Sequence, residues 1–378
     1  MIKYSDKEFI LAVCAAEWRL IMAKIKAAVI FGGVSGEHEL SLASAADVIR
    51  SIPADKYEVI CIGITKKGRW LYYPGDVEDI ASGKWEYNPD CTSAFISPDP
   101  IYKGIITIEN GETSVKKIDV VFPLLHGKIG ADGSVQGLLD MSGIPYVGCG
   151  LLASAACMDK SHTHTTLDDF NIKTAEWRLI TQRELNYIDE RCEQISGELG
   201  FPLVVKPANS GSTMGTTKAD DIAQLENAVK TAFSFDNKVV VEKYIGGREL
   251  EAAVFGYDTP FASYVGEVVE DFGDRNPDEC FISEKGKTVV PADLDSDTVN
   301  KVRETAVEAY KALGCKGLAR IDFLLGKDGE LYLNKISTMP GFKEDCVYPR
   351  LMKHLGLEMP HLTDKLLEQA IENSERVY

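Results

Sequence analysis

The sequence predicts an α/β protein whose N-terminal part holds a parallel sheet with covered faces. Short apolar runs alternate with segments of helical periodicity, first at residues 26–31 and 41–52. The pair Gly32-Gly33 directly follows the first run and predicts a tight turn at the end of a strand. A chain of 378 residues has room for two or three domains.

The expected elements follow in chain order. The run 26–31 (KAAVIF) is predicted to be a buried strand, and the segment 41–52 a helix with Ser41 as its N-cap. The helix is expected from the spacing of Leu42, Ala45, Ala46, Val48 and Ile49. Further strands are expected at 57–64, 118–124, 203–206, 239–242, 318–325 and 331–336, and further helices at 153–170, 298–313 and 360–371. The polar stretch 271–287 has no clear period and predicts a long surface loop, which is often a lid.

The pattern resets near residues 144–148, and this divides the chain. Residues 1–22 are expected to be an extension, because Met22-Ala23-Lys24 looks like a natural start just before a strand. The predicted domains are residues 23–148, 149–241 and 242–378.

The charge of the chain excludes two classes of partner. A formal charge of −17 repels nucleic acid and anionic membranes, so neither is expected as a partner. An anionic nucleotide must therefore be held by a local cluster of Lys, Arg and backbone N–H groups.

The cysteines and the apolar runs predict a cytoplasmic protein. The nine cysteines are odd in number and include no CxxC pair, which indicates reduced thiols rather than disulfides or a metal site. No apolar run reaches the length of a membrane span. The stretch 9–16 is rejected as a signal peptide, because acidic residues precede it and Glu17 follows it.

Two glycine-rich loops are candidate ligand sites in the N-terminal part. The first is 32–39 (GGVSGEHE), where free N–H groups favour an anion, whereas Glu37 and Glu39 would attract an ammonium. This loop is also consistent with a plain turn. The second is 126–133 (HGKIGADG), which directly follows a strand, where α/β sheets place ligands. The alternative for this loop is a structural turn with a hydrogen-bonded His126.

A lysine and a small-residue loop form the third candidate. Lys206 ends a strand and is followed by 210–215 (SGSTMG), whose N–H and hydroxyl donors suit a triphosphate. This is not a Walker A loop, because the lysine precedes the glycines. A flexible hairpin loop is the alternative.

Carboxylates mark the last two candidates. Glu242 at a strand exit, with Glu249 seven residues later, could bind adenine or ribose or belong to a solvated face. Arg320 and Asp322 share one face of a strand. Asp suits Mg²⁺ and Arg suits a developing oxyanion, but the pair could equally be a buried or edge ion pair.

Taken together, these motifs resemble the D-alanine–D-alanine ligase family, which includes D-Ala–D-Ser and D-Ala–D-Lac relatives. The resemblance covers about residues 24–371, with stretches such as GGVSGEHELSLASA, FPLVVKP, GLARIDF and STMPGF in the family's order. It implies an ATP-grasp fold: a substrate-binding domain at 23–148, then a central domain at 149–241 and a catalytic domain at 242–378, with ATP between the last two.

The resemblance also implies a role for each matching residue. Glu37 would hold the ammonium of the first substrate, with His126 near it. Arg320 and the backbone around Gly341 would stabilise the oxyanion, and Asp322 would bind Mg²⁺. Lys160 and Lys206 would contact the ATP phosphates, and Ser212 and Thr213 would cover the phosphate and help orient the base network. The adenosine pocket would be lined by Glu242, Lys243, Ile245 and Glu249.

The sequence departs from the family at the metal site. In the stretch 334–341 (NKISTMPG), Lys335 stands where the family has a bridging Glu, and Ser337 where it has an Asn. At about 4 Å and an effective dielectric constant near 20, each pair of unit charges interacts by roughly 4 kcal/mol. Mg²⁺ binding is therefore expected to be weakened. Lys335 could point away, pair with Asp322 or touch a phosphate.

The loop and the second-substrate pocket depart as well. Cys280-Phe281 stand roughly where the family's lid has Lys-Tyr. The residues 343–346 (KEDC) replace a Thr-Ser-x-Ser motif that helps bind the second substrate's carboxylate.

The resulting prediction is a D-Ala–D-Ala ligase-like enzyme that uses ATP, with Mg²⁺ weakened, to join two D-amino acids through an acyl phosphate for peptidoglycan precursors. One alternative is a noncatalytic member of the family that binds ATP or another ligand. Another is a D-Ala–D-Ser-type ligase. The resemblance also implies a homodimer.

Overall fold

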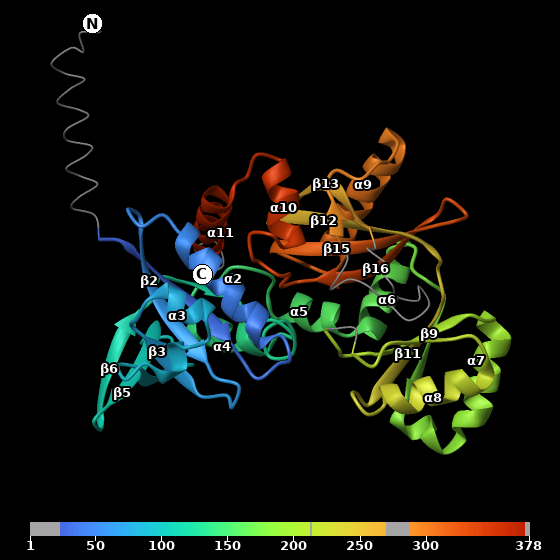
Figure 1. The fold of residues 1–378 in the computed structure, drawn as a ribbon, viewed down its shortest axis with the longest axis horizontal. Helices are drawn as coiled ribbons and strands as arrows, with labels where there is room; N and C mark the ends of the chain where they lie inside the picture. The colour runs from blue at the N-terminus through green and yellow to red at the C-terminus, as the bar shows by residue number, and fades with distance from the viewer. Residues whose placement is uncertain (1–22, 212–213, 270–286, 375–378) are drawn as a thin grey trace, which may run out of the picture.

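The computed structural model describes residues 23–211, 214–269 and 287–374. These residues form a seven-stranded, a four-stranded and a five-stranded sheet, each with helices packed on it (Figure 1). The predicted α/β class is confirmed. The predicted extension 1–22 lies outside the described residues, and so does nearly all of the predicted lid loop 271–287.

The N-terminal sheet is mixed rather than parallel throughout. Its order is β6-β5-β4-β3-β2-β1-β7, and only β2-β1-β7 are parallel. The parallel strands are β1 (Ile25–Gly32), β2 (Tyr57–Ile64) and β7 (Val120–Pro123), and the antiparallel ones are β3 (Trp70–Tyr73), β4 (Thr92–Ile96), β5 (Gly104–Glu109) and β6 (Glu112–Lys117). The antiparallel strands were not predicted. The connection from β5 to β6 is too short for a parallel crossover, which needs a dozen residues or more.

Both faces of the parallel strands are covered, as predicted. In β1, Ala27, Val29 and Phe31 share a core with helices α2 (His38–Ser51) and α11 (Met359–Ser374), while Ala28 and Ile30 pack toward α4 (Ser134–Ser142). Adjacent strand residues point to opposite faces, so one apolar run serves two cores.

The prediction of Ser41 as a helix N-cap is wrong. Helix α2 begins at His38, and Glu37 occupies the cap position. The hydroxyl of Ser41 instead accepts from Gly32 N–H at 2.7 Å and donates to Leu124 O at 2.5 Å. Ser41 therefore ties the end of β1 to the residue after β7, at the edge where the two glycine-rich loops leave the sheet.

The single helix predicted at 153–170 is two helices, α5 (Leu151–Met158) and α6 (Lys160–Asp169). Asp159 between them has an extended backbone, and its carboxylate accepts from the N–H groups of Ser161 and His162. The break arises because an Asp that caps the next helix leaves helical geometry itself.

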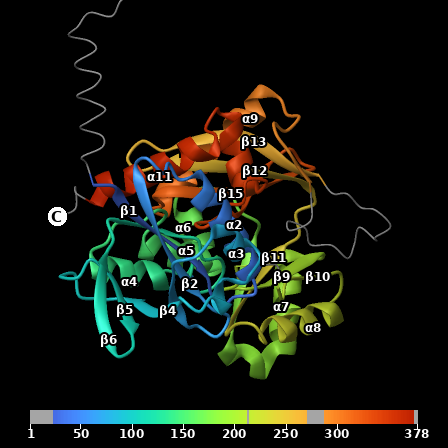
Figure 2. The ribbon, with the colours of Figure 1, turned by 60° about the vertical axis from the view of Figure 1, so that its left-hand side comes forward.

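The central sheet has the order β10-β9-β11-β8 and its own hydrophobic core. Helices α7 (Ile188–Leu199) and α8 (Ile222–Ala232) lie together on one side of it in both ribbon views (Figures 1 and 2). The strands are β8 (Trp177–Thr181), β9 (Leu203–Pro207), β10 (Thr217–Ala219) and β11 (Lys238–Lys243).

The C-terminal sheet has the order β14-β13-β12-β15-β16 and is antiparallel. Its strands are β12 (Gly247–Gly256), β13 (Phe261–Val269), β14 (Lys287–Val289), β15 (Gly317–Gly326) and β16 (Leu331–Ser337), with α9 (Ser296–Ala312) and α10 (Val347–His354) packed on it. The predicted strand pair at 318–325 and 331–336 is confirmed as β15 and β16. Phe342 and Tyr348 belong to the same core as Phe122, so this sheet and the N-terminal sheet share a core.

The remaining short helices are α3 (Val77–Ala81), η1 (Trp85–Tyr87) and η2 (Gln182–Tyr187). Over the three described ranges, no helix combines the length and apolar character that crossing a bilayer requires. The domain boundaries at 148/149 and 241/242 stay predictions.

Candidate functional site

A cavity of about 580 Å³ collects residues that are far apart in the sequence. Glu37 and His126 line it from the loops of the N-terminal sheet, and Lys160 from the start of α6. Arg320 and Lys335 line it from the hairpin β15–β16. Other lining residues are Gly127, Ser210, Gly211, Asn334, Ser337, Pro340, Gly341, Asp345 and Cys346.

The two glycine-rich loops of the N-terminal sheet contact each other at one end of this cavity. Ser35 Oγ donates to the carbonyl oxygen of His126 at 2.8 Å. Gly127 has a φ of +72°, and a Cβ atom built on it would lie 2.8 Å from Glu37 Oε2. Glycine is therefore required at Gly127 for its backbone conformation and for the close approach of the Glu37 carboxylate.

His126 joins these loops to the segment that follows β16. Its Nδ1 lies 3.2 Å from Met339 O, and its Nε2 lies 3.3 Å from Ser44 Oγ. A carbonyl only accepts, so Nδ1 carries the proton and Nε2 accepts from the Ser44 hydroxyl. Ser44 Oγ in turn accepts from Phe342 N–H at 3.1 Å. Burial lowers the pKa of His126 to about 4, so the ring is neutral at neutral pH.

The surroundings of His126 are consistent with both interpretations of the loop 126–133. The imidazole of His126 is buried and both its nitrogens have partners within the protein, as the structural alternative expected. His126 also lines the cavity, as the ligand-site prediction expected. The ring positions the cavity wall around residues 339–342, and the function of the loop as a ligand site stays a prediction.

Lys160 reaches the loop that follows β9. Its Nζ donates to the carbonyl oxygens of Ser210 at 2.8 Å and Pro207 at 3.1 Å. Burial, and then repulsion from Lys206 and Lys335, lower the pKa of Lys160 to about 7. Lys160 therefore lies in a positive field that an anionic ligand would relieve.

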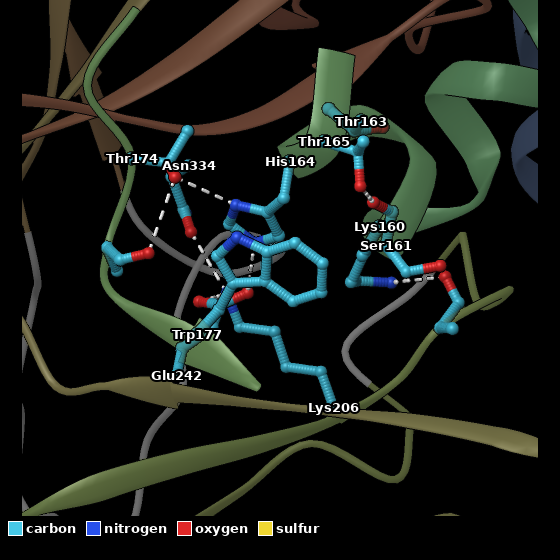
Figure 3. Close-up of polar contacts among 12 residues, drawn as sticks. Lys160, Ser161, Thr163, His164, Thr165, Thr174, Trp177, Lys206, Glu242 and Asn334 are labelled. Carbon is cyan, nitrogen blue, oxygen red and sulfur yellow. Dashed lines mark hydrogen bonds and ion pairs between the residues drawn. The ribbon is translucent and has the colours of Figure 1, made fainter. Parts of the chain in front are cut away.

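Figure 3 shows the second lysine, Lys206, in a buried network around Glu242. Glu242 Oε2 accepts from Lys206 Nζ at 2.6 Å, and Oε1 lies 3.0 Å from His164 Nε2. Lys206 Nζ also donates to Asn334 Oδ1 at 3.1 Å, and His164 Nδ1 lies 2.9 Å from Thr174 Oγ1. Burial alone would raise the pKa of Glu242, but Lys206 and His164 outweigh burial and hold the pKa at about 2. Both oxygens of this carboxylate are thus engaged inside the protein.

Arg320 and Asp322 form a buried ion pair on β15. Nε and Nη2 of Arg320 each donate to one oxygen of Asp322 at 2.7 Å. Glu251 on the neighbouring strand β12 lies 3.2 Å from Arg320 Nε and is 1 % exposed. Burial would lower the pKa of Arg320, but the two carboxylates outweigh it and raise the pKa. Arg320 and Asp322 thus form the buried ion pair that was one of the two interpretations of this motif. Arg320 also lines the cavity.

Two further carboxylates next to this pair have raised pKa values. Glu249 and Glu251 alternate on β12 and so point to the same side. Burial, and then repulsion from Asp322 and Glu251, raise the pKa of Glu249 to about 8. Burial also raises the pKa of Glu251 to about 7, although Arg320 opposes this. At neutral pH, Glu249 and Glu251 therefore carry less negative charge than two ordinary glutamates would.

Lys335 and Ser337 lie on β16 directly across from the ion pair. The strand register pairs Asp322 with Lys335 and Arg320 with Ser337. The Nζ of Lys335 donates to Gly211 O at 3.0 Å. The sequence left open whether Lys335 points away, pairs with Asp322 or touches a phosphate. In the structure its side chain is turned toward the loop that carries Ser210 and Gly211.

The segment after β16 closes the cavity. A Cβ atom built on Gly341 would lie 2.9 Å from Cys346 Sγ, so a larger residue would displace Cys346. Lys343 forms an ion pair with Asp345 at 2.8 Å, which offsets one of the two acids in the altered segment 343–346.

The predicted site residues divide into three groups. Glu37, His126, Lys160, Arg320, Lys335, Ser337 and Gly341 line the cavity. Within the described part of the chain, Lys206, Glu242, Lys243, Ile245, Glu249 and Asp322 are not in its lining. Ser212, Thr213, Cys280 and Phe281 lie outside the described residues. The roles assigned to all of these residues stay predictions.

Sequence reasoning missed two residues that organise the site, Ser44 and Glu251. Ser44 is a small polar residue within the apolar face of α2, and a buried hydroxyl there requires a partner. Glu251 follows Glu249 at strand spacing, which marks a second inward carboxylate. Both signals are local, but the partners of these residues come from distant strands and loops.

The fold and the site together define a class of protein. Two antiparallel sheets, at 177–243 and 247–337, flank a group of lysines, and an α/β domain precedes them. This is the ATP-grasp fold of the similar solved structures described next.

Known proteins are similar to this chain over nearly its whole length. Family models match residues 26–149 as the D-ala D-ala ligase N-terminus and residues 166–368 as the D-ala D-ala ligase C-terminus. The D-alanine–D-alanine ligase of Acetivibrio thermocellus is 42% identical over 362 residues, covering 92% of this chain and 96% of that protein. The chain therefore belongs to the D-alanine–D-alanine ligase family.

Solved structures of the family are also similar. The VanG D-Ala:D-Ser ligase from Enterococcus faecalis has a TM-score of 0.85 and 36% identity, covering 92% of this chain and 100% of that chain. The D-alanine-D-alanine ligase from Coxiella burnetii has a TM-score of 0.82 and 29% identity, covering 94% of this chain and 97% of that chain.

Proposed function

We propose that this protein is an ATP-dependent carbon–nitrogen ligase that joins two D-amino acids, with D-alanine as the first. The observation that carries the proposal is a single cavity that brings Glu37 and His126 to Lys160, Arg320 and Gly341. Such a cavity holds both a carboxylate for an ammonium group and cations for a triphosphate. Family membership supports the same activity.

The reaction requires little covalent chemistry from the protein. The carboxylate of the first D-amino acid attacks the γ-phosphorus of ATP, giving an acyl phosphate and ADP. The amine of the second D-amino acid then attacks the acyl carbon and loses a proton. The bond from that carbon to the phosphate oxygen breaks, which gives the dipeptide and inorganic phosphate. Catalysis consists of positioning the reactants and stabilising the charge that develops on oxygen.

Each residue then has a task. Glu37 accepts the ammonium of the first substrate, and His126 fixes the wall beside it. Arg320 and the backbone at Gly341 stabilise the oxyanion. The remaining assignments are the phosphate contacts of Lys160, Lys206, Ser212 and Thr213 and the adenosine contacts of Glu242, Lys243, Ile245 and Glu249.

One observation favours a second candidate, a noncatalytic member of the family that binds ATP. Both oxygens of Asp322 accept from Arg320, and Lys335 stands across the hairpin. Mg²⁺ prefers an octahedral set of oxygen ligands, with one or two carboxylates that are free to coordinate it. Metal-assisted turnover is weakened by this arrangement, and ATP binding is not.

We propose that the enzyme supplies peptidoglycan precursor synthesis, that it acts in the cytoplasm and, by family resemblance, that it is a homodimer. Light scattering coupled to size-exclusion chromatography tests the dimer. The similarity to a D-Ala:D-Ser ligase makes D-serine the first alternative acceptor to try.

The test is phosphate release from ATP in the presence of Mg²⁺, with and without D-alanine, and then with D-serine and D-lactate as acceptors. D-alanine-dependent release together with a dipeptide detected by mass spectrometry supports the ligase. Raised thermal stability with ATP but no release with any acceptor supports the noncatalytic alternative.

A pair of variants sharpens this test. Glu37→Gln removes the charge that faces the ammonium, so it should raise the KM for D-alanine by about tenfold or more and leave ATP affinity unchanged. Glu39→Gln is the matched control, because Glu39 is exposed two residues away and pairs with Lys66. Equal KM values for the two variants would remove Glu37 from the substrate site.

A further inference from the structure

Lysines from three separate elements lie beside the loop 207–211, two of them in contact with it and one directly before it in the chain. Lys160 donates to Ser210 O at 2.8 Å from the start of α6, and Lys335 donates to Gly211 O at 3.0 Å from β16. Lys206, on β9, donates to Asn334, the neighbour of Lys335, at 3.1 Å and to the Glu242 carboxylate at 2.6 Å. We call Lys160, Lys206 and Lys335 the lysine triad.

The members of the lysine triad share one electrostatic field. Lys206 and Lys335 each add to the effect of burial in depressing the pKa of Lys160. The Glu242 carboxylate, 2.6 Å from Lys206 Nζ, offsets part of this positive charge, and an anionic ligand beside Lys160 and Lys335 would offset the rest. Lys335, which stands where the family resemblance implies a metal-binding carboxylate, has therefore become part of the cationic wall.

The carboxylates nearby are a poor set of ligands for a divalent cation. Asp322 uses both oxygens on Arg320, and Glu251 also contacts that guanidinium. A divalent ion at Asp322 would face the guanidinium of Arg320, and the residue paired with Asp322 on the neighbouring strand is a lysine, Lys335. In ranges 23–211, 214–269 and 287–374, no group of three or more His, Cys, Asp or Glu side chains is arranged to hold a metal ion.

We infer that Lys335 supplies, as a built-in ammonium, positive charge that a divalent cation would otherwise bring to the nucleotide, so that this protein binds metal-free ATP at the lysine triad. The inference rests on the proposed function in one respect, that ATP is the ligand. The ligand chemistry is a triphosphate that carries its full negative charge, rather than a magnesium–nucleotide complex. Lysine suits this task because it is a compact point charge with three donors.

The experiment is isothermal titration of the full chain with ATP, once in EDTA and once in excess MgCl₂. The wild-type protein should bind ATP in EDTA at least as tightly as in MgCl₂. Lys335→Gln removes the charge and should weaken binding in EDTA by about tenfold or more. Lys335→Glu should weaken it further and should regain affinity when MgCl₂ is added, because it restores a carboxylate for the metal.

Lys301→Glu is the charge-matched control. Lys301 is exposed on α9 and forms only a 3.9 Å ion pair with Glu330. Its variant changes the net charge by the same two units, and should leave both dissociation constants unchanged. Thermal unfolding without nucleotide reports whether each variant is folded, and Lys335→Gln decides the test if Lys335→Glu does not fold.

The outcomes separate this inference from the proposed function. If the wild-type protein binds ATP only in MgCl₂, and Lys335→Gln has the same affinity as the wild type in EDTA, the inference is overturned and the ligase proposal stands. Absence of ATP binding in both buffers overturns both. Tight binding in EDTA that is lost in Lys335→Gln and kept in Lys301→Glu supports the inference, whether or not the protein turns over.

Discussion

At one end of the cavity, His126, Ser44 and the backbone of residues 339–342 are held by hydrogen bonds between neutral groups. The charged end of the site is held by ion pairs, between Arg320 and the carboxylates of Asp322 and Glu251 and between Lys206 and Glu242. A neutral network needs its partners only for hydrogen bonding, whereas a buried charge needs a partner of opposite sign. Removing one side chain from the charged end should therefore lower the free energy of unfolding more than removing one from the neutral end. The neutral end should lose stability mainly when the pH falls.

The largest expected effect is at the charged end. Arg320→Ala leaves Asp322 and Glu251 buried without their cation, so it should lower the free energy of unfolding by about 3–5 kcal/mol, measured by urea denaturation. Arg178→Ala is the control, because Arg178 pairs with Glu198 at the surface and should cost about 0–1 kcal/mol. Equal losses for the two variants would contradict the buried ion-pair account.

The neutral end should weaken as the pH falls. The pKa of His126 is about 4 in the folded protein and 6.5 in the unfolded chain. Between these values the unfolded state binds a proton that the folded state does not. The free energy of unfolding contributed by His126 should therefore fall as pH drops from about 6.5 to about 4, by up to roughly 1.4 kcal/mol per pH unit.

The variant His126→Asn isolates this contribution. Its stability, measured by urea denaturation across the same pH range, should fall less steeply in acid than that of the wild type. His361→Asn is the matched control, because His361 is exposed on α11. If the wild type and His126→Asn have the same pH slope, His126 is not the group that titrates.

A smaller loss of stability is expected from Ser44→Ala. The substitution removes the acceptor for Phe342 N–H and the donor to His126 Nε2, so it should lower the free energy of unfolding by about 1–3 kcal/mol. Ser82→Ala, at an exposed serine, should change it by less than about 0.5 kcal/mol. A neutral result at Ser44 would mean that the hydrogen bonds to it are dispensable.

The smallest effect is a protonation change when ATP binds. Lys160 has a pKa of about 7, so at pH 8 it is mostly neutral, and a phosphate beside it would raise its pKa and make it take up a proton. ATP is already fully ionised at that pH. Titrations in buffers of different ionisation enthalpy should show net proton uptake in the wild type and none in Lys160→Gln. Identical enthalpies in all buffers would contradict the shifted pKa.

The sequence predicted those elements in which buried residues form a clear local pattern of apolar side chains. The strand expected at 57–64 is β2 itself, because an apolar run buried on both faces has a distinct signature. The antiparallel strands between residues 70 and 117 have weaker patterns, and the residues of β6 are almost all exposed. Their pairing depends on neighbours, which a local pattern does not record.

The same limit applies to the site. His126 and Arg320 were predicted from their motifs and Lys160 from the family resemblance, and all three line the cavity. That Asp322 would be occupied by Arg320, with Glu251 beside it, depends on the register of β12 against β15. That register is set by contacts between segments about seventy residues apart, and no spacing within one segment predicts it.

The measurement that tests the central claim most directly follows oxygen from substrate to phosphate. The protein is incubated with ATP, Mg²⁺ and D-alanine labelled with ¹⁸O in its carboxylate, and the released phosphate is examined by mass spectrometry. An acyl phosphate formed at this site predicts phosphate that carries one ¹⁸O, together with a dipeptide. Phosphate without label would mean that water attacks ATP, and would contradict the assignment of this protein as a ligase.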